Sequence, residues 1–201
     1  RAGFIGIGFT NASAVVSPPG GNKAILGTNP IAMSIPSRNG DIAFQFDQST
    51  SAIALGKITM ASAAGENIPI GWAVDSQGND TTNPNEALKG SLKSSGDYKG
   101  WGFGLMTEVL AAAFTGSVNS LDVKGLKLPE GKPHDLGQCY IILDPSTHGS
   151  FFFDRIEKII TAVSEQEGTR LPGSNFVMPK TVKIEKKIFD QLSKLSKGPT
   201  S

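Results

Sequence analysis

The sequence predicts a mixed α/β fold of the α+β type, with a largely antiparallel sheet flanked by helices. Three observations predict it. Short apolar strand patterns fill the first quarter of the chain, an Asn-Gly turn joins two of them directly, and amphipathic helix patterns follow later. A turn that short leaves no room for a crossover helix, so the two strands it joins are antiparallel.

The first elements follow from alternation and from turn residues. Residues 4–10 alternate apolar residues with glycines and predict a strand, and residues 31–35 predict a second strand that ends at Pro36. Asn39-Gly40 lies at the centre of a hairpin-type turn. Residues 42–47 then alternate apolar with small or polar side chains, which predicts a half-buried strand.

The remaining elements follow in chain order. Residues 51–64 are rich in small side chains and are compatible with a helix, and residues 68–74 predict an extended run. Residues 99–114 predict the clearest helix, because Phe103, Met106, Leu110 and Phe114 recur at helical spacing. A strand at 138–143 and helices at 152–163 and 184–195 complete the prediction.

Charge and composition exclude several classes of function. The 201 residues contain 19 Lys and Arg against 18 Asp and Glu, so a charge of +1 gives no general attraction for nucleic acid or membrane. The longest apolar stretch, residues 100–116, carries Glu108 and is shorter than the ~20 residues of a spanning helix. Cys139 is the single cysteine, which excludes a disulfide framework and a cysteine-based zinc site, and no metal is expected. One cysteine is compatible with a reducing cytoplasm.

Two glycine-bearing motifs fail their structural tests. Gly6-Ile7-Gly8 lacks the third glycine and the following helix of a dinucleotide fingerprint, so a Rossmann fold is not predicted. The stretch at 75–80 resembles a calcium loop, but its glycine is misplaced and the bidentate Glu is missing. We interpret it as a turn.

Residues 96–100, Gly-Asp-Tyr-Lys-Gly, are a better candidate because they precede the best helix. Free N–H groups at a helix start, the Lys99 charge and the small Gly100 suit a phosphate or carboxylate ligand. An ordinary loop entering a helix explains the same residues, and the sequence favours that explanation.

Other polar residues each allow two interpretations. Asp47 ends an apolar strand, where partial desolvation would suit proton transfer, but it equally suits a helix N-cap. Thr28, Asn29 and Ser13 can bond a ligand or their own backbone. The remaining candidates, expected to be a buried cysteine and surface histidines without a nucleophile partner, are Cys139, His134 and His148.

In this order, however, the motifs resemble the malate/L-lactate dehydrogenase family of NAD(P)-dependent oxidoreductases, which is distinct from the Rossmann-type enzymes. The resemblance runs from about residue 4 to 195. It rests on five ordered segments: 10–16 with 20–21 and 27–32, 46–57, 71–75 with 81–84, 96–110, and 168–173.

The resemblance implies a cofactor domain on a largely antiparallel sheet, homodimers in the cytoplasm, and reduction of 2-oxo acids or cyclic imines with NADPH or NADH. It implies that Asp47 lies near the reacting centre. It implies cofactor contacts for one set of residues: Ser13, Thr28, Asn29, Pro30, Gln48, Ser49, Thr50, Lys99, Gly100 and, less strongly, Arg170.

The resemblance also implies that a segment is missing. Family members usually have over a hundred residues before this region, which carry the acid–base histidine and a substrate-binding arginine. We therefore expect residues 1–178 to be the NAD(P)-binding domain and residues 179–201 to form a helix that returns to the catalytic domain. The alternative is a truncated, non-catalytic member that retains only nucleotide binding.

Overall fold

The computed structural model describes residues 1–124, 134–174 and 180–196. Its main feature is a four-stranded antiparallel sheet in the order β3-β2-β1-β6, with β1 at Ile5–Thr10, β2 at Ile31–Pro36, β3 at Ile42–Gln48 and β6 at Gln138–Leu143. Asn39 and Gly40 make the turn between β2 and β3, where the Asn39 carboxamide oxygen accepts a bond from the backbone N–H of Asp41 and Gly40 has a φ of +83°. The predicted antiparallel sheet is therefore confirmed.

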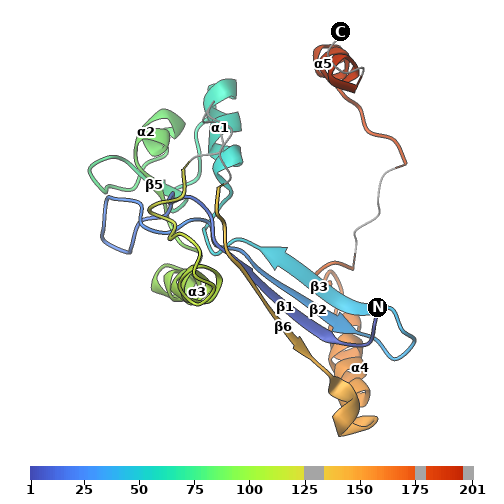
Figure 1. The fold of residues 1–201 in the computed structure, drawn as a ribbon. Helices are drawn as coiled ribbons and strands as arrows, with labels where there is room; N and C mark the ends of the chain where they lie inside the picture. The colour runs from blue at the N-terminus through green and yellow to red at the C-terminus, as the bar shows by residue number, and fades with distance from the viewer. Residues whose placement is uncertain (125–133, 175–179, 197–201) are drawn as a thin grey trace.

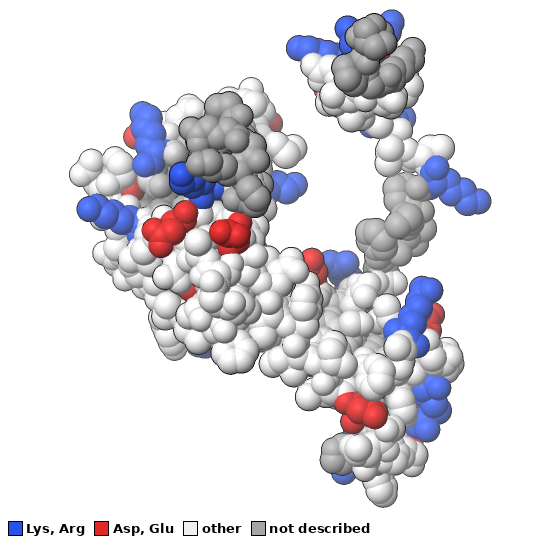
Figure 2. Space-filling view, viewed as in Figure 1, with Lys and Arg blue, Asp and Glu red and all other residues white. Residues whose placement is uncertain are grey.

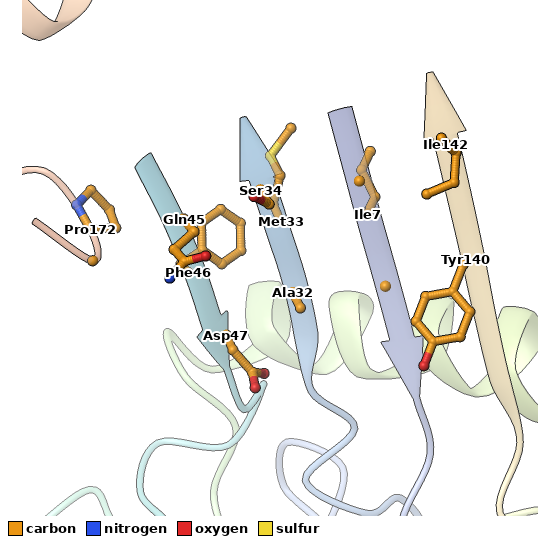
Figure 3. Close-up of a pocket in the computed structure, with 13 residues that line it drawn as sticks. Ile7, Ala32, Met33, Ser34, Gln45, Phe46, Asp47, Tyr140, Ile142 and Pro172 are labelled. Carbon is orange, nitrogen blue, oxygen red and sulfur yellow. The ribbon is translucent and has the colours of Figure 1, made fainter. Parts of the chain in front are cut away.

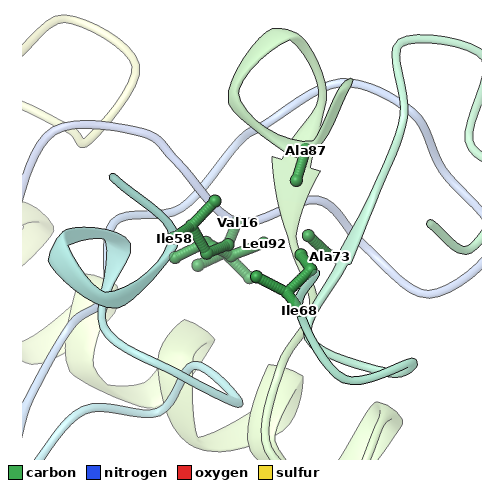
Figure 4. Packing of buried hydrophobic residues seen from close by; sticks show 6 residues of the cluster. All are labelled: Val16, Ile58, Ile68, Ala73, Ala87 and Leu92. Carbon is green, nitrogen blue, oxygen red and sulfur yellow. The ribbon is translucent and has the colours of Figure 1, made fainter. Parts of the chain in front are cut away.

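A helical lobe lies at one end of the sheet (Figure 1). It contains α1 (Leu55–Ala64), α2 (Pro84–Lys89), α3 (Tyr98–Glu108) and the short antiparallel pair β4 (Ala73–Val74) and β5 (Ser91–Leu92). The α3 helix continues into a π-helical turn, η1 (Val109–Ala113). A cluster of buried hydrophobic residues lies in this lobe and is formed by Val16, Ile58, Ile68, Ala73, Ala87 and Leu92 (Figure 4).

The other end of the sheet carries the 3₁₀ turn η2 (Pro145–His148) and helix α4 (Phe151–Ser164). Arg38 fastens α4 to the β2–β3 turn: it pairs with Asp154 at 2.5 Å and Glu157 at 2.9 Å, and its guanidinium lies 5.5 Å from the centre of the Phe153 ring. Both carboxylates raise the pKa of Arg38, mainly through the hydrogen bond to Glu157.

The last described helix, α5 (Lys186–Ser196), stands apart from the other elements (Figure 1). Its apolar side chains are exposed, including Ile188, Leu192 and Leu195. The expected domain boundary at 178/179 falls outside the described residues. Charged side chains of both signs are scattered over the lobe and around α4, while the surface between the lobe and α4 is largely uncharged (Figure 2). No helix among the described residues has the length and apolarity needed to span a membrane.

Helix α3 is placed as predicted, but its apolar side chains face outward. The buried positions are occupied by Gly100, Gly104 and Thr107, while Phe103, Met106 and Phe114 are exposed. The spacing of the apolar residues locates this helix, but these residues do not form its packed face, because the helix approaches neighbouring backbone too closely for large side chains. An alanine Cβ at Gly100 would lie 2.1 Å from the Ser95 carbonyl oxygen.

Three smaller predictions are corrected by the structure. The helix expected at 51–64 begins only at Leu55, and of the extended run at 68–74 only Ala73 and Val74 pair as a strand. Cys139, expected to be buried, is half-buried. The turn at 75–80 is confirmed, since the Asp75 carboxylate accepts bonds from the N–H groups of Gln77 and Asn79.

Candidate functional site

One face of the main sheet forms an open groove of about 590 Å³ (Figure 3). The strand register brings Tyr140, Gly8, Ala32 and Asp47 into one row across the four strands. Directly paired residues point to the same face, and so do residues two apart on a strand. A second row on this face therefore contains Ile142, Gly6, Ser34 and Gln45.

The two central strands give this groove a flat floor. On this face the two strands present Gly6, Gly8, Ala32 and Ser34, so no side chain larger than a hydroxymethyl group stands on the floor. Ile7 and Met33, which also line the groove, alternate with these residues along the strands. Neighbouring strands lie roughly 4.8 Å apart, so the walls on β6 and β3 are separated by about 14 Å. A planar ring with an attached sugar fits between such walls.

The walls differ in chemistry. Tyr140 and Ile142 form an apolar wall on β6, and Gln45 and Asp47 form a polar wall on β3 (Figure 3). Pro172 and Gly173 extend the polar wall: the Pro172 carbonyl accepts from the Gln45 N–H, and a Cβ at Gly173 would lie 2.8 Å from the Gln45 carbonyl oxygen. Asp47 is the only charged side chain that lines the groove in the described part of the chain. An anion is therefore disfavoured on the floor.

Asp47 lies inside β3, and α1 starts eight residues later with Ala54 at its N-cap. This excludes the N-cap interpretation of Asp47. The carboxylate is exposed, so the described residues alone do not supply the desolvation that the sequence suggested.

The turn at residues 27–30 lies where β3 leaves the sheet. Thr50 connects the two segments, since both its N–H and its hydroxyl donate to the Thr28 carbonyl, at 2.9 and 3.0 Å. The Thr50 carbonyl in turn accepts from the N–H of Ser95. These bonds join the predicted residues at 28–30 and 48–50 to the loop that enters α3. We call the place where these three segments meet the junction.

The start of α3 has an unusual backbone. Asp97 has a φ of +59° and a ψ of −124°, a conformation that favours glycine, and Gly96 before it also has a positive φ. Such strain at a non-glycine residue is often found at functional sites. Lys99 is exposed on the first turn, and Gly100 is buried against Ser95. The arrangement can receive an anion, which is the explanation that the sequence favours less than an ordinary loop entering a helix.

The predicted residues separate into three groups. Thr28, Pro30, Ser49 and Ser13 are half-buried around this junction, and Gln48 and Lys99 are exposed there. Asn29 and Thr50 are buried and hydrogen-bonded within the protein, so their side chains serve the framework of the site. Arg170 is exposed and precedes the Pro172–Gly173 wall rather than the junction.

Sequence reasoning missed the groove itself. Gly6 and Gly8 were noticed only as an incomplete dinucleotide fingerprint, and Tyr140 was not selected. The available signal was the combination of two glycines two positions apart in a strand with aromatic and acidic residues in other strands. The sequence alone does not show that these residues share one face of the sheet, because that depends on the register in which the strands pair.

The two histidines do not belong to the groove as far as it is described. His134 is half-buried and its Nδ1 lies 2.8 Å from the Lys124 carbonyl oxygen, while the side chain of His148 lies outside the described residues. Cys139 pairs with Phe9 and so points to the opposite face of the sheet. No group of three or more potential metal-binding His, Cys, Asp or Glu side chains exists within the part of the chain that the structure describes.

Comparisons with known proteins give a consistent result. The family model for malate/L-lactate dehydrogenase matches residues 1–184. The chain is 40% identical over 174 residues to a (2R)-3-sulfolactate dehydrogenase (NADP(+)) of Chromohalobacter salexigens, covering 87% of this chain and 52% of that protein. It is 38% identical over 179 residues to a Δ¹-pyrroline-2-carboxylate/Δ¹-piperideine-2-carboxylate reductase of Pseudomonas aeruginosa, covering 86% and 52%.

Solved structures agree. The sulfolactate dehydrogenase from Methanocaldococcus jannaschii superposes with a TM-score of 0.81 at 31% identity, over 96% of this chain and 59% of that one. The Δ¹-piperideine-2-carboxylate reductase from Pseudomonas syringae pv. tomato gives 0.77 at 30% identity, over 99% and 57%. The chain thus spans a little over half the length of these relatives.

Proposed function

The chain belongs to the malate/L-lactate dehydrogenase family, and we propose that it is the cofactor-binding part of an NADPH- or NADH-dependent oxidoreductase. The reaction is hydride transfer between the nicotinamide and a 2-oxo acid or a cyclic imino acid. The names of the relatives support this, because sulfolactate is a 2-hydroxy acid and pyrroline-2-carboxylate is a cyclic imine. They do not favour a member that only binds nucleotide, since these relatives are named dehydrogenases and reductases.

The observation that carries the proposal is the groove floor of Gly6, Gly8, Ala32 and Ser34. A floor free of large side chains fits a planar ring lying flat on the sheet, with Tyr140 along one side. Asp47 on the other side disfavours phosphate but tolerates an uncharged or positively charged ring. The nicotinamide end of the cofactor has these properties, and when bound it supplies the hydride.

The remaining parts of a dinucleotide are assigned to the junction beside the groove. Lys99, with the N–H groups at the start of α3, holds the pyrophosphate, and Gly100 keeps the backbone accessible. The residues of the turn, Thr28 to Pro30, face the carboxamide, with Asn29 acting through its neighbours. Further contacts are assigned to Ser13, Gln48, Ser49, Thr50 and Arg170.

Asp47 is the residue of this chain to which we assign a role in proton transfer. Its carboxylate lies beside the ring site and orients the group that delivers a proton to the developing alkoxide or amine. We assign the acid–base histidine itself to the additional length that the relatives carry. In this arrangement residues 1–178 form the cofactor domain, and residues 179–201, with α5, pack on the catalytic domain.

We further propose that the protein is a homodimer in the cytoplasm. The dimer is supported by the exposed apolar face of α3 and η1, which carries Leu105, Met106 and Val109. Faces of this kind usually mark an interaction surface. The free thiol of Cys139 is compatible with a reducing compartment. Sedimentation of the protein at micromolar concentration tests the dimer, and a monomer contradicts it.

The test of the cofactor assignment is a fluorescence titration with NADPH and with NADH. Lys99→Ala removes a charge-assisted contact worth roughly 1.5–3 kcal/mol, so we expect binding to weaken at least about tenfold. Lys57→Ala is the matched control, because Lys57 is an exposed lysine on α1 away from the groove. Equal effects of the two substitutions, or no binding of either nucleotide, would contradict the proposal.

A further inference from the structure

Glu108, the last residue of α3, makes an unusual set of contacts. Its carboxylate accepts three hydrogen bonds: from the Asn29 amide at 2.8 Å, from the Ser120 N–H at 2.6 Å and from the Ser120 hydroxyl at 2.5 Å. All three partners are neutral donors, and none of the ion pairs among the described residues includes Glu108. The residue is half-buried and has no role in the chemistry assigned above.

Asn29 connects this carboxylate to the cofactor site. Asn29 is fully buried, with a φ of +35°, and its amide nitrogen donates to both Glu108 and the Gly104 carbonyl oxygen, the latter at 3.1 Å. Its amide oxygen accepts from the N–H of Ala12 at 3.2 Å. One side chain therefore binds the loop after β1, the turn before β2 and helix α3 together.

Each of these three segments carries a part of the cofactor site. Ser13 follows Ala12, Thr28 and Pro30 flank Asn29, and Lys99 lies at the other end of α3. Glu108 lies nine positions after Lys99, which is about 14 Å along a helix. A helix fixed at Glu108 and packed at Gly104, where an added Cβ would lie 3.2 Å from Leu26 and Thr50, has its Lys99 end fixed as well.

We propose that Glu108 is a positioning residue for cofactor binding, which sets the distance between the turn at residues 27–30 and the start of α3. This inference rests on the proposed function. The inference goes beyond the proposed function because it assigns a positioning role to a residue that touches no ligand. Its consequence is specific: a ligand that spans both segments depends on Glu108, while a ligand that occupies only one of them does not.

The experiment compares Glu108→Gln with Thr107→Val. Glu108→Gln keeps the shape of the side chain, but its N–H₂ group then faces the Asn29 and Ser120 donors, which disrupts these hydrogen bonds locally. Thr107, the neighbouring residue, is fully buried, and its hydroxyl has no partner among the described residues, so Thr107→Val is expected to be neutral. The probes are NADPH, followed by its fluorescence, and two competitors that each reach one segment: nicotinamide riboside, which has no phosphate for Lys99, and 2′,5′-ADP, which has no carboxamide for the turn.

We expect Glu108→Gln to weaken NADPH binding about tenfold or more, and to change binding of nicotinamide riboside and of 2′,5′-ADP less than about twofold. Ser120→Ala removes one of the three donors and should weaken NADPH about threefold, which keeps the test valid if Glu108→Gln does not fold. Thr107→Val should match the wild type for all three probes.

The failures are distinguishable. Unchanged NADPH binding in Glu108→Gln, or equal losses for NADPH, nicotinamide riboside and 2′,5′-ADP, overturns the positioning role while the wild-type protein still binds. A wild-type chain that binds no nicotinamide nucleotide overturns the proposed function, and this inference with it.

Discussion

Glycine at position 6 should be required for ligand binding but not for folding, so substituting it should have opposite effects on binding and on stability. It lies on the groove floor in β1, without a positive φ, and a Cβ added there would find its nearest atom, Ile142 Cδ1, at 3.9 Å. Nothing in the described structure therefore requires glycine at this position. Since glycine loses more conformational freedom on folding than alanine, Gly6→Ala should stabilise the protein by about 0.5–1 kcal/mol. For a chain of this length that raises Tm by roughly 1–4 °C.

The effect on binding has the opposite sign. A side chain at Gly6 stands on the surface where the ring is proposed to lie. Overfilling a packed contact costs roughly 1–3 kcal/mol, which corresponds to about 5- to 150-fold in Kd. We expect the larger valine in Gly6→Val to weaken NADPH binding within this range.

The assays are thermal unfolding and NADPH fluorescence titration. Gly56→Ala is the control, because Gly56 lies in α1 with nothing within 4 Å of an added Cβ. It should stabilise the helix by up to about 1 kcal/mol and leave binding unchanged. If Gly6→Ala destabilises the fold, the space above Gly6 is not open. If Gly6→Val binds NADPH as well as the wild type, the assignment of the floor to the ring is wrong.

Three further outcomes are expected. Gly100→Ala should destabilise by about 3 kcal/mol in urea unfolding, since its Cβ would lie 2.1 Å from the Ser95 carbonyl oxygen; wild-type stability would refute the packing. Asp97→Gly should stabilise by about 1 kcal/mol by relieving a positive φ, and a loss would contradict the strain. Backbone N–H groups, of Asn79 and of Ser146 respectively, lower the pKa values of Asp75 and Asp144. The stability that the two ionised carboxylates contribute is present above pH ~4 and is lost as the pH falls below it. Asp75→Asn and Asp144→Asn should therefore make the free energy of unfolding in urea less dependent on pH between about pH 5 and 3.

Local patterns were sufficient for the hairpin of β2 and β3. The alternation at residues 42–47 and the Asn39-Gly40 turn depend on neighbours in sequence, and both strands and their pairing are found where predicted. The start of α3 at Tyr98 was predicted to within one residue. By contrast, α2, β5 and the pairing of β5 with β4 were not predicted, because these elements are short and are stabilised by contacts within the lobe core.

Long-range contacts decided what the sequence could not predict. The spacing of Phe103 and Met106 located the helix, but not the side on which it packs, because Gly100 and Gly104 allow a closer approach than any large side chain. The sequence allows Asn29 to bond either a ligand or its own backbone. Its partner Glu108 is 79 residues away, and only the fold brings the two together.

The central claim is that the nicotinamide ring lies on the floor formed by Gly6 and Gly8. The most direct measurement is an intermolecular nuclear Overhauser experiment on the labelled chain with bound NADPH. We predict transfer from the nicotinamide ring protons to the α-protons of Gly6 and Gly8 and to the ring of Tyr140. Bound NADPH whose nicotinamide protons instead contact residues outside the groove would contradict the account.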